Sequence, residues 1–161
     1  MAGDFNSVLT ALCQKLRLFQ DIKTISVKQL EFIVAFDVER GSFEPWEKFF
    51  NSREKLMLKA NGLEDKINHY RRDIGINDLT DAEIKEKLFP EHYQEYMRYS
   101  EEIAEIISGI LANDRRAMDF MKVLLDKTGT KINRARVQKK AFNAYTQYES
   151  HPEAWFFDKK K

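Results

Sequence analysis

The chain has 161 residues, of which 43% are hydrophobic and 33% charged, with six glycines and three prolines. This length fits one domain with a sizeable core, and the composition excludes both a disordered chain and a β-rich fold with frequent turns. The 27 basic residues nearly balance the 26 acidic ones, so a nucleic-acid or membrane partner has to be argued from local clusters of charge.

Apolar residues recur at three- and four-residue steps over residues 4–40, which predicts one long amphipathic helix with Gly41 as its C-terminal stop. Ser42 is expected to cap a second helix, with Pro45 in the first turn, where the missing N–H of proline costs little. A second apolar stripe with helical spacing then covers residues 46–70. The first seventy residues therefore predict two long helices joined by a short connection.

The helical pattern stops around residues 74–78. Residues 80–83 read Thr-Asp-Ala-Glu, a capping box that predicts a short helix ending before Pro90. A third long helix is expected from about residue 91 to residue 127. The predicted fold is all-α, an antiparallel bundle of three long helices with a short connecting helix and a C-terminal helical tail. The bundle is assigned to residues 1–129 and the tail to residues 130–161 of the same domain.

Catalytic and metal-binding patterns are missing from the sequence. The only histidines, at positions 69, 92 and 151, and the single Cys13 lack the spacings that place several metal ligands on one helix face, so surface histidines are the better interpretation. The glutamates within residues 101–105 fit a solvated helix face, and no phosphate loop or nucleophile motif occurs. We expect no enzyme activity, no metal and no cofactor.

The cellular compartment of the protein is inferred from its cysteine content, its N-terminus and its apolar stretches. The lone Cys13 suits a reducing environment, and the N-terminus at residues 1–5 lacks the basic region followed by an apolar run that marks a secretion signal. No apolar stretch approaches the roughly 20 residues that span a membrane. A cytoplasmic protein without a membrane span is expected.

Asp114 falls within the apolar stripe of the third long helix, where an unpaired carboxylate would be costly. Arg53 sits in a similar position between Phe50 and Leu56 of the second. A pair between Arg53 and Asp114 could fix the helix register, but the offset of the two helices cannot be read from sequence. A charge that sets register or lies at the rim is favoured over a functional one.

The C-terminal segment departs from the pattern of the bundle. Residues 127–140 carry six basic and no acidic side chains, yet the fold motif and strongly basic domain of a nucleic-acid binder are lacking. A narrow apolar stripe follows this segment, formed by Ile132, Val137, Ala141, Ala144 or Tyr145, and Tyr148. Two interpretations stay open, since the stripe could dock on the bundle or receive a partner helix. The closing aromatic residues, which are typical interface anchors, are Trp155, Phe156 and Phe157.

Three stretches resemble the small helical chaperones of flagellar type III export, of the FlgN/FliT type. The first leads from Phe-Asp at 36–37 through Pro-Trp at 45–46 to the arginine–glutamate–lysine centre at 53–55. The second runs from the isoleucine-rich residues 103–107 to Asn-Asp-Arg at 113–115, similar to a third helix with an aspartate at its middle. The third and most specific is Lys-Lys-Ala-Phe-Asn-Ala-Tyr at 139–145 followed by Phe-Phe-Asp-Lys-Lys-Lys at 156–161.

This resemblance implies a cytoplasmic bundle that shields the amphipathic terminal helices of late flagellar subunits, either hook–filament junction proteins or the filament cap protein. Components of the export apparatus are a further implied partner. Such a helix-in-groove complex hides apolar surface reversibly. The partner-binding residues expected from it form an apolar line of Val137, Ala141, Phe142, Tyr145 and Tyr148, flanked by Arg134 and Lys140 and followed by Trp155, Phe156 and Phe157.

Two other classes of function remain alternatives. One is a coiled-coil scaffold or self-associating helical protein without a secretion role. A molecular mass that depends on protein concentration would support this alternative. The other is a helical module that binds nucleic acid through the basic segment. Strongly salt-dependent binding to duplexes of arbitrary sequence would support this alternative. The client, the branch of the family and the oligomeric state are not readable from the sequence.

Overall fold

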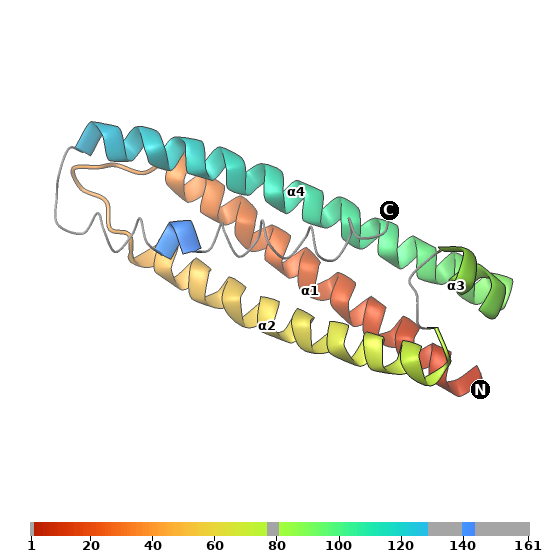
Figure 1. The fold of residues 1–161 in the computed structure, drawn as a ribbon. Helices are drawn as coiled ribbons and strands as arrows, with labels where there is room; N and C mark the ends of the chain where they lie inside the picture. Colours follow the sequence, from red (N-terminus) through yellow and green to blue (C-terminus); the bar gives the residue numbers. More distant parts are fainter. Residues whose placement is uncertain (1, 77–80, 129–139, 144–161) are drawn as a thin grey trace.

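The structure is a computed structural model that describes residues 2–76, 81–128 and 140–143. Its helices are α1 (Ala2–Val34), α2 (Glu44–Asp73), α3 (Asp81–Lys87) and α4 (Pro90–Thr128). Most of the described residues are helical, and no strand occurs among them. The three long helices lie side by side, and the short α3 lies at the end where α4 begins (Figure 1). The prediction of a mainly helical fold is confirmed.

Helix α1 packs against both α2 and α4. Along the contacts between α1 and α2, residue numbers increase on α1 while they decrease on α2. Along the contacts between α1 and α4, residue numbers increase on both helices. The pairs that define this register are Lys15–Glu64 and Gln29–Arg53 toward α2, and Phe5–His92 and Ser26–Asn113 toward α4.

The first helix ends at Val34, several residues before the stop expected at Gly41. The backbone amide of Glu39 donates a hydrogen bond of 2.9 Å to Oδ1 of Asp37. This side-chain bond competes with the backbone hydrogen bonds that would continue the helix. The ring of Phe36 meanwhile turns onto Phe43, with 4.3 Å between ring centroids. The prediction of a helix up to residue 40 was therefore wrong by about six residues.

The starts of the other long helices agree with the sequence to within one residue. Pro45 lies in the first turn of α2, and α4 begins at Pro90. Phe43 takes the cap position of α2 that was expected for Ser42, although the Ser42 hydroxyl accepts a bond of 3.3 Å from the amide of Glu44. The short helix α3 follows the predicted capping box, whose Thr80 lies outside the described residues.

Gly75 ends α2. Its φ of +76° is a left-handed conformation that favours glycine. The amide of Ile76 donates to the carbonyl of Arg71 and the amide of Gly75 to that of Arg72, both at 2.9 Å, which is the bond pattern of a Schellman motif. Ile76 is thereby directed into the core, where it is 3% exposed.

The buried apolar side chains of the described residues form two separate clusters. The larger, the proximal core, is built from α1 up to Ile22, α2 from Ala60 onward and α4 up to Ile110, with Ile76 and Ile84. The smaller, the distal core, consists of Ile33, Trp46, Ala117, Met121 and Ala141. Between them lies a set of polar side chains, which we call the polar layer: Ser26, Gln29, Arg53, Asn113 and Asp114.

Candidate functional site

The described part of the C-terminal segment is one helical turn, residues 140–143, that lies beside the start of α2 (Figure 1). Ala141 is buried in the distal core with Trp46 and Met121. The ammonium group of Lys140 lies 3.5 Å from Oε1 of Glu47 on α2. This ion pair is half exposed and therefore weak, whereas the apolar side chain of Ala141 is buried.

Phe142 follows the buried Ala141 directly, yet it is 62% exposed. Neighbouring residues of a helix point about 100° apart, so one turn can place Ala141 on the bundle and Phe142 toward solvent. Of the residues expected to bind a partner, the structure describes Lys140, Ala141 and Phe142 and holds them on one turn. The others lie outside the described residues: Arg134, Val137, Tyr145, Tyr148, Trp155, Phe156 and Phe157.

Exposed apolar side chains gather around this distal end. Eight large hydrophobic residues are exposed in the described part of the chain, and five of them lie beyond the polar layer. A single exposed apolar residue needs no explanation, but several at one end of a molecule are typical of an interaction surface. We call this set the distal apolar surface; it consists of Val34, Val38, Phe120, Val123 and Phe142.

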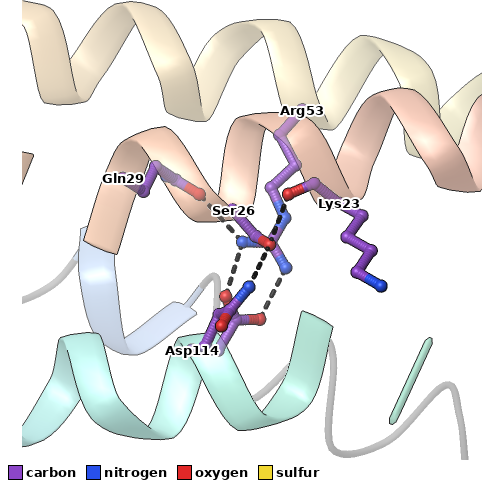
Figure 2. A network of polar contacts seen from close by, with 6 residues as sticks. Lys23, Ser26, Gln29, Arg53 and Asp114 are labelled. Atoms are coloured by element: carbon purple, nitrogen blue, oxygen red, sulfur yellow. Dashed lines mark hydrogen bonds and ion pairs between the residues drawn. The ribbon is translucent and has the colours of Figure 1, made fainter. Parts of the chain in front are cut away.

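The polar layer holds the three long helices in register at its level. Arg53 of α2 donates to both carboxylate oxygens of Asp114 on α4, at 2.7 and 2.5 Å, and to Oε1 of Gln29 on α1 at 2.9 Å (Figure 2). The side chains of Arg53 and Asp114 are each only 6% exposed. The two-pronged geometry matches the flat guanidinium to the carboxylate, and the pair that the sequence suggested is confirmed.

Ser26 completes the polar layer on the side of α1. Its hydroxyl donates to the carbonyl of Lys23 at 2.8 Å and accepts a bond of 3.1 Å from the amide nitrogen of Asn113. The side chains of Lys23, Ser26, Gln29, Arg53 and Asp114 are drawn together in Figure 2. Because these groups satisfy one another inside the bundle, the arrangement is suited to fixing the register of the helices.

A second buried contact between α2 and α4 was not predicted. Nη2 of Arg71 donates to the hydroxyl of Tyr96 at 2.7 Å, and its guanidinium carbon lies 5.7 Å from the centre of the tyrosine ring. Burial raises the pKa of Tyr96 above its usual value of 10.0, against the opposing effect of the Arg71 charge. Arg71 follows Arg53 by eighteen residues and Tyr96 precedes Asp114 by eighteen, which is five helical turns on each helix. That spacing was the signal in the sequence.

The remaining candidate residues are scattered. His69 is exposed and lies 3.5 Å from Asp73 of its own helix, whereas His92 is half buried with its ring 5.4 Å from that of Phe5. His151 lies outside the described residues. Within residues 2–76, 81–128 and 140–143, no group of three or more His, Cys, Asp or Glu side chains could hold a metal ion. In the same described ranges, no helix has both the length and the apolarity that a bilayer crossing requires.

Comparisons of the chain with protein-family models, with curated proteins and with solved structures find no match.

Proposed function

We propose that this chain is a cytoplasmic export chaperone, a binding protein and not an enzyme. Its clients are the amphipathic terminal helices of late flagellar subunits, the hook–filament junction proteins or the filament cap protein, which it shields before type III secretion. The distal apolar surface supports this proposal most directly, because it offers apolar side chains at the same end of the molecule as the C-terminal turn. The resemblance of three sequence stretches to the FlgN/FliT chaperones supplies the class of client.

The proposal includes an antiparallel arrangement of the three long helices. The contacts that support it run in opposite directions between α1 and α2 and in the same direction between α1 and α4. The contacts Arg53–Asp114 and Arg71–Tyr96 run in opposite directions between α2 and α4. An amphipathic client helix would pack along the long helices of such a bundle with its apolar face.

In this proposal Ala141 and Phe142 have different tasks. Ala141 attaches the C-terminal turn to the bundle, and Phe142 contacts the client together with Val137, Tyr145 and Tyr148. A large aromatic ring buries much area for little loss of side-chain entropy, which suits Phe142 to be an anchor of the complex. Lys140 and Arg134 flank the contact line with positive charge, which steers acidic clients and adds less to affinity.

The test is a titration of fluorescent peptides that carry the terminal helices of hook–filament junction proteins and of the filament cap protein. A variant that combines Val137→Asp with Tyr145→Ala, and separately Phe142→Asp, is expected to lose binding at least roughly tenfold, equal to about 1.4 kcal/mol. Leu58→Asp is the matched control, because Leu58 is 65% exposed on α2 and lies outside the distal apolar surface. Helical content and melting temperature should match the wild type in all variants.

Two results contradict the proposal. One is that the contact-line variants bind the peptides with unchanged affinity. The other is that binding is lost together with a large drop in melting temperature, since the substituted residues would then belong to the fold. Binding that is lost equally in Leu58→Asp would show that apolar exposure in general, and not the distal end, carries the interaction.

A further inference from the structure

The polar layer divides the interior at the same level in all three long helices. On α1, Ser26 and Gln29 stand between Ile22 of the proximal core and Leu30, which packs on the distal core. On α2, Arg53 stands between Trp46 of the distal core and Leu56, which packs on the proximal core. On α4, the residues that separate the two cores are Asn113 and Asp114, between Leu111 and Ala117.

We propose that this layer splits the molecule into two cooperative units, and that the distal unit opens while the proximal unit stays folded. The proximal unit comprises residues 5–22, 56–76 and 84–111, and the distal unit comprises residues 30–50, 117–128 and 140–143. The device is independent of the identity of any client, so it stands or falls separately from the proposed function.

The first reason is that no continuous apolar core crosses the layer within residues 2–76, 81–128 and 140–143. Apolar packing normally forms one contiguous cluster in a domain, and cooperative unfolding depends on that continuity. In the described part of this chain the buried apolar residues fall into two clusters. The bonds of Arg53 to Asp114 and Gln29 run across the bundle from helix to helix, so they tie the helices together at one level without linking the two cores.

The second reason is the difference in size between the two cores. Among the residues that the structure describes, the proximal core has sixteen buried members and the distal core five, of which two are alanines, Ala117 and Ala141. Because hydrophobic stabilisation grows with the apolar area buried, opening the distal unit costs much less free energy than opening the proximal one. The Arg53–Asp114 pair then marks the boundary at which the opening stops.

Native-state amide hydrogen exchange of the full chain at low urea concentrations tests the proposal. We expect the amides of Ile33, Trp46 and Met121 to exchange at least roughly tenfold faster than those of Leu12, Ile67 and Ile103, with a weaker dependence on urea. Exchange of all these amides with one rate and one dependence on urea would overturn the proposal.

Two variants separate the two units further. Ala141→Asp places a charge in the distal core and should speed exchange in the distal unit only, whereas Ala112→Asp, at an exposed site of α4, is the matched control and should change neither unit. Equal effects of Ala141→Asp on both units, including no effect on either, would overturn the proposal.

The role of the polar layer itself is tested by an apolar triple variant, Arg53→Met with Asp114→Leu and Gln29→Leu. Joining the two cores should raise protection of the distal amides to that of the proximal ones. A folded triple variant that keeps the wild-type difference would overturn the proposal. If this variant does not fold, the urea series on the wild type and Ala141→Asp decide the question.

Discussion

Replacing Arg53 with methionine is the most informative perturbation of the fold. Methionine keeps much of the length and apolar volume of the side chain, but it removes one charge and the hydrogen bonds of the guanidinium to Asp114 and Gln29. In the wild type the side chain of Asp114 is only 6% exposed, and both of its carboxylate oxygens accept hydrogen bonds from the guanidinium of Arg53. In the variant this buried carboxylate loses the guanidinium. Gln29 loses the donor that lies 2.9 Å from its Oε1.

The expected loss of stability follows from the burial of this pair. Removing one partner of a buried ion pair costs about 3–5 kcal/mol, because an uncompensated charge is left inside the protein. At about 2–4 °C per kcal/mol for a chain of this size, the melting temperature should fall by about 6–20 °C. The apolar triple variant, in which Asp114 and Gln29 are replaced as well, should recover most of this loss, since replacing a whole buried pair by apolar residues is often neutral or stabilising.

Urea and thermal unfolding followed by circular dichroism at 222 nm measure these differences. Asp114→Asn serves as a further control, because it keeps the shape of the side chain while it removes the charge and replaces one of the two acceptor oxygens with an NH2 donor. The reasoning is refuted if Arg53→Met costs less than about 1 kcal/mol, as an exposed pair would. It is also refuted if the triple variant is as unstable as the single one, because the loss would then come from packing and not from the stranded carboxylate.

Three further predictions concern single residues. Burial raises the pKa of Tyr96 above 10.0, so the stability that this residue contributes is fully present below pH 10 and is lost as the pH rises through the raised pKa. In a pH series of urea titrations, Tyr96→Phe should remove this loss of stability at alkaline pH. At neutral pH the same variant should cost about 1–3 kcal/mol, since Arg71 loses a hydrogen-bond partner. Gly62→Ala should stabilise the protein by about 1 kcal/mol in the same titration, because Gly62 lies inside α2 and an added methyl group meets nothing within 4 Å. Gly75→Ala should destabilise it by about 1–2 kcal/mol, because the φ of +76° is unfavourable for any side chain, and an unchanged midpoint would contradict the Schellman motif at the end of α2.

Much of the fold could be predicted because local signals set it. Pro45 and Pro90 mark helix starts by their chemistry alone, and the periodicity of the apolar residues gives the buried faces. The end of the first helix was predicted wrongly because the periodicity continues to residue 40 while Asp37 bonds to the amide of Glu39 instead. Periodicity does not reveal such competition for backbone groups.

The candidate site was predicted less completely, because it depends on how distant segments meet. A carboxylate on an apolar stripe demands a partner, which led to Arg53 for Asp114. Arg71 carried no such signal by itself, since an arginine near a helix end usually lies in solvent. The burial of Ala141 on the distal core depends on the path of the chain after α4, which the spacing of apolar residues does not fix.

In the function proposed above, this chain binds a late flagellar subunit and shields its terminal helices. The most direct measurement is light scattering coupled to size-exclusion chromatography, on the full chain alone and mixed with a full-length hook–filament junction protein or filament cap protein. We predict a mass for the chain alone that does not change with concentration and, in the mixture, one peak whose mass is the sum of one chain and one subunit. Separate elution from both subunits would contradict the claim, and a mass of the chain alone that rises with concentration would point to a self-associating helical scaffold instead.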